Sequence, residues 1–293
     1  MTVQGLFNKA EQKIRAKEVF TVVDANGEVR DDVKVVTPEM QEATKKRKHL
    51  EVYRKRTDTP FTLVNMESTK EVAVMEQLNT KELGYFLVLQ TYVDYENMLK
   101  MPHSNLPMTE KELGKALRVK QPRTYKKVLN KFIEIGLMFK KPVTLYGKEY
   151  EAFFIAKKYC FRGSSKSDKV VKVFIGSLKE LYKQEEIKPA DIGFLYKLLP
   201  YMHYESNHLV KNPYERDYAR AQALSQRDVV LITGLDEKNV KKHLRMKLSG
   251  VHVFGTFKAG KNTIYKVNPS LFFRGIEPTE ELRADFTLTG QSL

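Results

Sequence analysis

Two stretches of the sequence collect side chains suited to binding phosphate groups and the edges of nucleic-acid bases. The first offers Arg118, Lys120, Gln121, Arg123, Thr124, Lys126, Lys127, Asn130 and Lys131, with Lys141 and Lys148 further along. The second offers Lys238, Asn239, Lys241, Lys242, Arg245 and Lys247, with Lys258, Lys261 and Asn262 further along. Lysine mostly neutralises phosphate, whereas arginine and side-chain amides can make bidentate contacts with bases.

Side-chain chemistry assigns different tasks within these stretches. We assign base readout to Gln121, Arg123, Asn239 and Arg245, and we expect the lysines to supply affinity that falls as salt rises. The alternative is that both stretches are solvated helix faces, which often carry such charges. Because similar charges recur at corresponding places in two parts of the chain, we favour contact with nucleic acid.

A second recurring pattern involves tyrosine and glutamate. The segment FLVLQTYVDYE at residues 86–96 is echoed by LYKLLPYMHYE at residues 195–205, so the same spacing recurs in Tyr92, Tyr95, Glu96 and in Tyr201, Tyr204, Glu205. The pattern is either a catalytic cluster present twice or scaffolding shared by two domains. We favour scaffolding, with the tyrosine hydroxyls tying the end of a buried helix to a neighbouring strand or hairpin.

Known catalytic motifs are not found. The six histidines lack metal-ligand spacing, and His203 and His208 stand five apart rather than four. The phosphate loop GxxxxGK[ST] is absent, and VHVFG holds only one of the two histidines of a rolling-circle nickase. The pattern of a tyrosine recombinase is imitated only by KHLRMKLSG at residues 242–250, which the repeat described below explains better. We therefore expect a protein that is not an enzyme and uses no cofactor or metal.

Composition narrows the class of protein further. Of 293 residues, 42% are hydrophobic, and 51 basic against 36 acidic side chains give a net charge of +15. This charge favours a polyanionic partner, most simply nucleic acid, although ribosomal proteins share it. No run of 18 apolar residues or signal peptide is found, so we expect a cytoplasmic protein without membrane contact. The single cysteine, Cys160, suits a reducing compartment, excludes all-cysteine zinc modules and is expected in the core.

The elements that position the basic residues belong to an internal repeat. A shift of 109 residues gives nine identities without a gap, among them Lys70 with Lys179, Gly84 with Gly193 and Tyr92 with Tyr201. The similarity resumes further on, where YKKVLNKFIEIGL parallels VKKHLRMKLSGV and YCFRG parallels LFFRG. The sequence therefore predicts two copies of one domain, joined by the short polar linker GSSKSDK.

Each copy begins with an extended segment, FTLVNM or VKVFIG, which is followed by STKEVAVMEQL or SLKELYK and then by a mostly apolar helix. In the first copy this apolar helix carries ELGYFLVLQTYVDYENML, and its composition predicts burial at the centre of the domain. In the second copy Pro200 is expected to kink the corresponding helix.

Each copy then shows the pattern of a helix-turn-helix and a hairpin. Capping boxes, Thr109 with Glu112 and Ser225 with Asp228, start a short helix. A longer helix follows, ending at Gly136 or Gly250. Two β-rich runs then turn at residues 146–148 or 259–261. A helix-turn-helix followed by a hairpin is a winged helix, whose second helix enters the major groove.

The expected fold is therefore α+β, mainly α, with two tandem winged-helix domains and an N-terminal extension. The predicted boundaries are an extension at 1–60, domain 1 at 61–163, a linker at 164–169, domain 2 at 170–276 and a tail at 277–293. Within the extension we expect a hairpin at Asn26-Gly27 and a charged helix over residues 38–56. That helix is an arm laid on phosphates, a solvated helix or a packing strut.

Four segments resemble winged-helix proteins of Gram-positive plasmids and their phages: LGYFLVLQTYVDYENML, IGFLYKLLPYMHYESNHLVKNPYE, LSQRDVVLITGL and IYKVNPSLFFRG. The chain looks most like plasmid replication proteins with NPSLFFRG after the wing, and it is similar in architecture to initiators that bind repeated origin sequences. The resemblance covers both copies but not residues 1–60. It implies DNA contact by residues 121–131 and 238–247 in a bacterial cytoplasm. The first copy has Ala156-Lys157 in place of Asn268-Pro269, so the copies differ there.

The predicted function is sequence-specific binding of double-stranded DNA, with two modules reading two adjacent half-sites. The expected role is initiation of plasmid or phage replication through origin repeats, with host replication proteins as partners. A transcription regulator of the same element, acting as repressor or activator with host transcription proteins, is the alternative. A second alternative is that one copy serves for dimerisation or for binding a protein partner.

Overall fold

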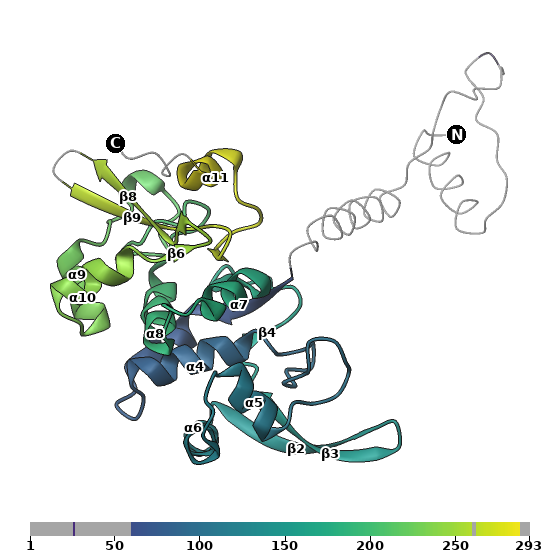
Figure 1. Ribbon diagram of the computed structural model, residues 1–293. Helices are drawn as coiled ribbons and strands as arrows, with labels where there is room; N and C mark the ends of the chain where they lie inside the picture. Colours follow the sequence, from purple (N-terminus) through teal and green to yellow (C-terminus); the bar gives the residue numbers. More distant parts are fainter. Residues whose placement is uncertain (1–25, 27–59, 260–261, 288–293) are drawn as a thin grey trace. The chain divides into compact units, whose positions relative to one another are not determined.

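The computed structural model describes residue 26, residues 60–259 and residues 262–287. The chain divides into two units, Met1–Asp58 and Thr59–Leu293. The expected N-terminal hairpin and helix lie outside the described residues, except for Asn26, which lies in a turn. The helices and strands below all belong to the second unit (Figure 1).

The same order of elements occurs twice along this unit. Copy 1, residues 61–163, contains β1 (Phe61–Asn65), α3 (Met66–Ala73), α4 (Thr80–Gln90), α5 (Glu110–Ala116), α6 (Pro122–Glu134), β2 (Met138–Leu145), β3 (Lys148–Ile155) and β4 (Cys160–Phe161). Copy 2, residues 170–276, begins with β5 (Val170–Phe174), α7 (Ile175–Lys183), α8 (Pro189–Leu198) and two 3₁₀ turns, η1 (Leu199–Tyr201) and η2 (Tyr218–Arg220).

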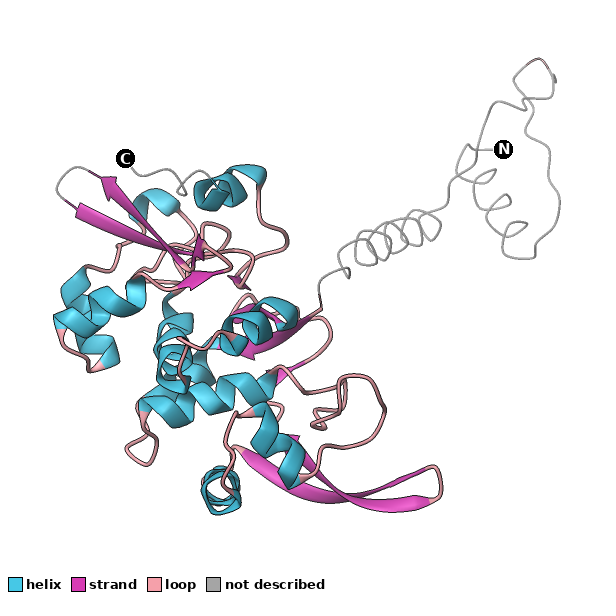
Figure 2. Ribbon diagram, viewed as in Figure 1, coloured by secondary structure: helices cyan, strands magenta, loops and turns pink. Residues whose placement is uncertain are grey.

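Copy 2 continues with the counterparts of the later elements of copy 1. These are α9 (Gln226–Thr233), α10 (Glu237–Leu244), β8 (Phe254–Ala259), β9 (Asn262–Val267) and β10 (Phe272–Phe273), which correspond to α5, α6, β2, β3 and β4. Between α10 and β8 lie two short strands without a counterpart in copy 1, β6 (Lys247–Leu248) and β7 (Val251–His252), and α11 (Glu280–Thr287) follows the copy. The described part of the chain is thus a mixed α+β structure with nine α-helices and small antiparallel sheets, including hairpins (Figure 2).

Several local signals in the sequence produce the expected structure. Both capping boxes form, with the backbone N–H of Thr109 donating to Glu112 at 2.7 Å and that of Ser225 donating to Asp228 at 2.8 Å. Helix α4 is buried from Leu83 to Gln90, as predicted, but it ends at Gln90, before the tyrosine motif that was expected to lie on it. The corresponding helix α8 ends before Pro200, which lies in the 3₁₀ turn η1.

The long helix of copy 2 is shorter than predicted. Helix α10 ends at Leu244 rather than at Gly250, and the chain passes into the short hairpin β6–β7. Ser249 and Gly250 turn this hairpin with φ angles of 50° and 87°, a left-handed pair typical of two-residue hairpin turns. Lys247 therefore lies on a strand and not on the helix.

One sheet joins the two copies. Its strand order is β10-β5-β1-β4, and β1 pairs antiparallel with β5 so that Leu63 lies opposite Lys172. These two residues are equivalent, because the repeat shift is 109. On either side of this pair, Thr62 lies opposite Val173 and Val64 lies opposite Val171. Because Thr62 is equivalent to Val171 and Val64 to Val173, each residue faces the equivalent of the other. A rotation of 180° produces such an exchange and a translation does not, so the copies are related here by a pseudo-two-fold axis.

The pair of central helices obeys the same symmetry. A Cβ atom on Gly84 would lie 1.8 Å from the carbonyl oxygen of Pro189, and one on Gly193 would lie 1.7 Å from that of Thr80. Gly84 is equivalent to Gly193, and Thr80 to Pro189. The two helices cross closely enough to admit only glycine at both positions, which explains why the repeat keeps both.

The recurring tyrosines also pack across this axis. The Lys70 ammonium lies 5.7 Å from the ring centre of Tyr201, and the Lys179 ammonium lies 3.6 Å from that of Tyr92. Burial, with repulsion from neighbouring cations, lowers the pKa of Lys179 to about 8. The repeated lysines and tyrosines are thus reciprocal partners that join one copy to the other.

The expected role of the tyrosine hydroxyls needs correction at the next position. Tyr95 is 67% exposed, and its ring faces the Arg162 guanidinium at 5.1 Å. Its equivalent, Tyr204, faces the Arg216 guanidinium at 4.3 Å. These rings meet cations instead of buried hydroxyl partners, so the motif is scaffolding held by cation–π contact.

An asparagine pair missed in the sequence holds the later part of each copy. Asn97 and Asn207 both adopt left-handed backbone conformations and are buried. The Asn97 amide donates to the carbonyls of Ile155 and Cys160 at 3.1 and 2.6 Å. The Asn207 amide donates to the corresponding carbonyls of Val267 and Phe272 at 3.0 and 2.7 Å. Each amide thereby ties the chain after a central helix to a hairpin strand and to the shared sheet.

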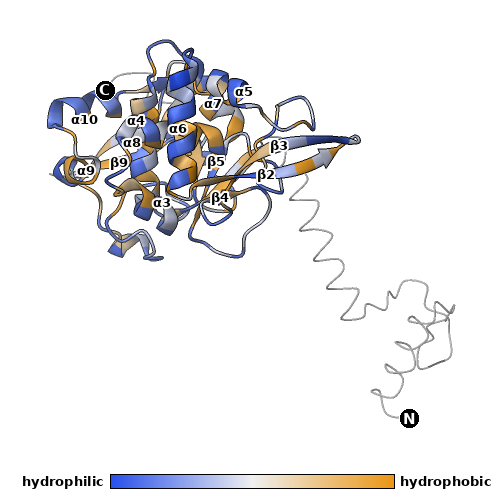
Figure 3. Ribbon diagram, turned by 90° about the horizontal axis from the view of Figure 1, so that it is seen from below, coloured by the Kyte–Doolittle hydropathy of each residue, from blue (hydrophilic) through white to orange (hydrophobic). Residues whose placement is uncertain are grey.

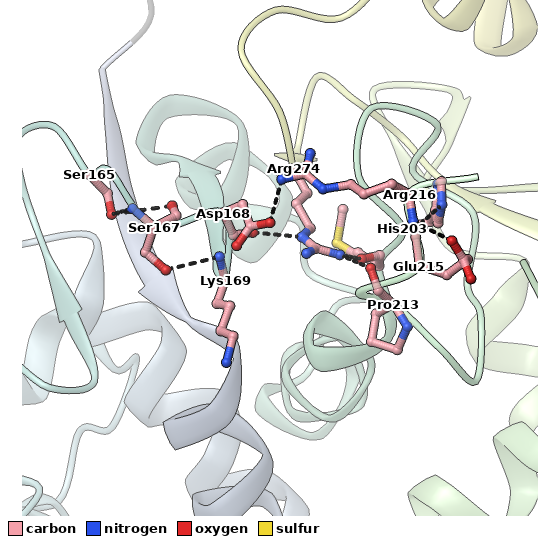
Figure 4. A network of polar contacts seen from close by, with 10 residues as sticks. Ser165, Ser167, Asp168, Lys169, His203, Pro213, Glu215, Arg216 and Arg274 are labelled. Atoms are coloured by element: carbon pink, nitrogen blue, oxygen red, sulfur yellow. Dashed lines mark hydrogen bonds and ion pairs between the residues drawn. The ribbon is translucent and has the colours of Figure 1, made fainter. Parts of the chain in front are cut away.

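The segment between the copies is fixed by buried Arg274 (Figure 4). Its guanidinium donates to the carbonyls of Asp168 at 2.9 Å, Met202 at 2.8 Å and Pro213. The carboxylate of Asp168 accepts from Arg216 at 2.5 Å. Cys160 lies fully buried in the core to which both copies contribute, as predicted.

Candidate nucleic-acid interface

Helix α6 presents a polar face to solvent because its apolar residues form one stripe. Tyr125, Val128, Leu129 and Phe132 are buried against the core. The opposite face exposes the predicted residues Gln121, Arg123, Thr124, Lys126, Lys127 and Asn130, and Lys120 is exposed just before it. Figure 3 shows α6 in front of α4 and α8, with hydrophilic residues along its outer side.

Two predicted contact residues of copy 1 serve the framework instead. The Arg118 guanidinium donates to the carbonyls of Tyr182, Gln184 and Ile187 at the end of α7, the last two at 3.1 Å. The Lys131 ammonium lies 2.8 Å from the Glu82 carboxylate of α4. The sequence predicted DNA contact for both from their charge and their place in or beside the second helix, but their donors are engaged within the protein and they lie outside the candidate interface.

Helix α10 occupies the corresponding place in copy 2. Val240 and Leu244 are buried, whereas its solvent side exposes Lys238, Asn239, Lys241 and Lys242, followed by Arg245 and Lys247. His243 points inward, where Nδ1 lies 2.8 Å from Asp191 of α8 and the ring stacks on Phe194 at 4.7 Å. Burial acts to raise the pKa of Asp191, but hydrogen bonds from His243 and the Lys188 N–H hold it below its ordinary value.

The same kind of contact therefore orients both long helices. Glu82 and Asp191 are equivalent residues, and each occupies the third position of its central helix. Each binds a basic side chain of the long helix in its own copy, Lys131 of α6 or His243 of α10. The charges that face solvent are thus fixed relative to the pair of central helices.

Acidic residues distinguish the start of α10 from that of α6. Asp236 caps α10 and is followed by Glu237, whereas α6 starts at Gln121-Pro122-Arg123. The backbone and side-chain N–H groups of Asn239 donate to Asp236 at 2.8 and 2.6 Å and lower the pKa of that carboxyl. The amide that we assigned to base readout is therefore engaged within the helix, beside a carboxylate that stays charged.

The hairpins extend both candidate surfaces. Lys141 and Lys148 are exposed on β2 and β3, whereas Lys140 lies 3.2 Å from both Glu110 and Glu151. In copy 2 the backbone of Lys258 and Asn262 lies on β8 and β9, while Lys261 lies outside the described residues.

A groove beside the first hairpin was not foreseen from the sequence. Its volume is about 680 Å³, and its lining includes Lys100, His103, Tyr146, Lys148 and Tyr150. Tyr146 is 77% exposed and accepts a hydrogen bond from Asn105 at 3.3 Å. The only signal in the sequence was the aromatic residue at the turn, which hairpin patterns do not distinguish from a structural one.

Within residues 26, 60–259 and 262–287, no group of three histidine, cysteine, aspartate or glutamate side chains is placed to hold a metal ion. No helix in the same part of the chain is both long and apolar enough to cross a bilayer. Comparison with protein-family models, curated proteins and solved structures found no match.

Proposed function

We propose that this chain is a sequence-specific binding protein for double-stranded DNA, built from two winged-helix modules. The observation that carries the proposal is the duplicated surface: α6 and α10 each follow a capped short helix, precede a hairpin and expose basic side chains. In a winged helix this second helix enters the major groove and the hairpin lies along the backbone. The net charge of +15 supports the same polyanionic partner.

Within each surface, residues take different tasks. Arg123 and Gln121 stand at the exposed start of α6, where base edges are reached, and Lys126, Lys127, Lys141 and Lys148 neutralise phosphates. In copy 2, Lys238, Lys241, Lys242 and Arg245 form the corresponding set. The role we propose is initiation of plasmid or phage replication at an origin, with regulation of transcription in the same element as the alternative.

A second candidate function is favoured by the acidic start of α10. Asp236 and Glu237 repel phosphate at the position from which α6 would contact bases. Copy 2 would then bind a protein partner or a second chain, while copy 1 alone contacts DNA.

The test compares two variants that lose the same charge. Arg123→Ala/Lys126→Ala/Lys127→Ala removes three exposed cations from α6, and Lys157→Ala/Lys166→Ala/Lys183→Ala removes three exposed cations elsewhere. Affinity for duplex DNA is measured between about 50 and 200 mM salt. We expect the α6 variant to bind about 100-fold more weakly with a salt slope smaller by about 2–3, and the control to change little. Equal effects of the two variants would refute the proposed surface.

Binding measured with the promoter and the origin of the element that carries the gene separates the roles. Preferred binding to repeats at the origin supports initiation, and preferred binding to a promoter operator supports regulation. Replacing Lys241, Lys242 and Arg245 with alanine tests the second copy, and unchanged DNA binding after that replacement would overturn the two-module proposal.

A further inference from the structure

We infer that the two copies meet one DNA duplex with opposite polarity, so that the half-sites are inverted with respect to each other. This inference rests on the proposed function, because it concerns how α6 and α10 meet the same duplex. It differs from the sequence-based expectation of two adjacent half-sites, which left their relative direction open.

The pseudo-two-fold axis is the observation that carries this inference. Three independent contacts obey it: the pairing of Leu63 with Lys172, the crossing of Gly84 over Gly193, and the exchanged cation–π contacts that Lys70 and Lys179 make. They involve a sheet, a helix pair and side chains on separate elements. The symmetry therefore belongs to the whole interface between the copies and not to one strand pair.

The symmetry extends from the interface to the long helices. Equivalent acids, Glu82 on α4 and Asp191 on α8, bind Lys131 of α6 and His243 of α10. Each long helix also packs a ring against the central helix of its own copy: Phe132 of α6 lies 5.6 Å from Phe86 of α4, and His243 of α10 lies 4.7 Å from Phe194 of α8, measured between ring centres. Since α4 and α8 are related by a rotation of 180°, we expect the directions of α6 and α10 to be related by the same rotation.

Duplex DNA has two-fold axes perpendicular to its length, so a two-fold protein contacts two half-sites in opposite directions. The same reasoning applies to two copies within one chain, whereas copies related by translation would read direct repeats. The bases of the two half-sites need not match, because Arg123 and Asn130 on α6 correspond to Lys238 and Arg245 on α10. The symmetry lies in the polarity of the contacts.

The buried cysteine allows this polarity to be measured. Cys160 is fully buried, so a thiol reagent reaches only a cysteine introduced at the surface. Four variants place one exposed cysteine near the start or end of each helix: Arg123→Cys and Asn130→Cys on α6, Lys238→Cys and Arg245→Cys on α10. Each full-length variant is labelled with an iron chelate that cleaves nearby DNA. It is then mixed with the DNA duplex that the unmodified chain binds most tightly in a selection from random sequences.

Cleavage is mapped on both strands, with the labelled unmodified chain as the control for Cys160. Moving the label by seven residues along a helix spans about 10 Å, or about three base pairs at most. We expect the step from Arg123 to Asn130 to move the cuts toward one end of the duplex, and the step from Lys238 to Arg245 to move them toward the other.

Cuts that move in the same direction for both helices would overturn the inverted arrangement and leave the proposed DNA binding intact. Cuts from the α6 labels alone would also overturn it, because copy 2 would not contact the duplex. Selection of no duplex by the unmodified chain would refute the proposed function itself, and with it this inference.

Discussion

Copy 1 and copy 2 are most alike where they touch each other and least alike where they face solvent. Several residues beside the pseudo-two-fold axis are identical in the two copies, as with Gly84 and Gly193, because the same close fit is needed on both sides of the axis. The long helices have diverged: residues 118–131 hold six basic and no acidic residues, whereas residues 236–247 hold five basic and two acidic ones. The contact between the copies has constrained the interior, while each surface was free to acquire its own chemistry.

The largest expected effect concerns the shared interior. Gly193→Ala places a methyl group 1.7 Å from the Thr80 carbonyl oxygen, so we expect the free energy of unfolding to fall by about 3 kcal/mol in urea denaturation. Gly176→Ala on α7 is the matched control, because nothing lies within 4 Å of its added Cβ. If both variants unfold at the same urea concentration, the helices do not cross as closely as described.

The next effect tests the divergence of the two surfaces. We expect Arg123→Ala/Lys126→Ala/Lys127→Ala to weaken DNA binding about 100-fold, and Lys241→Ala/Lys242→Ala/Arg245→Ala about ten-fold. The second loss is smaller because Asp236 and Glu237 already offset part of the charge near α10. Fluorescence titrations at one salt concentration compare the variants directly. A larger loss from the α10 variant would reverse the assignment of copy 1 as the stronger module.

A third comparison concerns acid sensitivity, which we expect to reside in copy 2. Burial, with repulsion from Lys266, lowers the pKa of His208 to about 4, whereas the equivalent residue of copy 1 is Met98, packed against Ala152 and Phe154. The unfolded chain, with a histidine pKa near 6.5, binds the proton first. Stability is therefore complete above about pH 6.5 and is lost as the pH falls toward 4.

His208→Met, which installs the residue of copy 1, should remove part of this loss. We expect the drop in unfolding free energy between pH 7 and 5 to shrink by about 1 kcal/mol, measured by urea denaturation at both pH values. His203 and His252 retain their own contributions, since burial also lowers the pKa of each. An unchanged pH dependence would show that His208 is not the sensitive group.

The smallest expected effect comes from a substitution that makes the charge at the start of α10 more like that of α6. Glu237→Gln removes a carboxylate that lies 3.7 Å from the Lys241 ammonium, leaving that lysine free to neutralise phosphate. We expect DNA binding to strengthen by about two- to five-fold, with a salt slope larger by at most about 1. Glu185→Gln, another exposed glutamate of copy 2, serves as control. Equal gains in both variants would indicate a general charge effect rather than a local one.

Much of the local structure could be predicted because it depends on neighbouring residues. The capping box at Thr109 and the two-residue turn at Tyr146-Gly147 follow from side-chain and backbone preferences that act within a few positions. The end of α10 was misplaced because Gly250 is a plausible helix end, while the alternation of buried Met246 with exposed Lys247 was too short to indicate a strand.

The arrangement of the copies could not be predicted in this way. A repeat shows that two segments share a fold, but translation and rotation leave the same pattern in the sequence. Arg118 shows the consequence for the candidate site: its charge suited DNA contact, and only the position of α7 from the other copy reveals that its donors are engaged. Lys70 and Tyr92 recur in the second copy because each contacts a residue of the opposite copy, Lys70 the ring of Tyr201 and Tyr92 the ammonium of Lys179. The sequence alone does not show these contacts.

The pairing of β1 with β5 also determines when this protein can finish folding during synthesis. Strand β1 ends at Asn65, but its partner β5 ends at Phe174. More than one hundred further residues must therefore be synthesised before β1 can pair with β5. Such distant pairing slows folding and leaves an unpaired strand edge exposed meanwhile. Because β1 pairs with its own equivalent, β1 strands from two unfinished chains would pair in much the same register. Crowded synthesis of this protein should therefore favour dimers joined through their β1 strands.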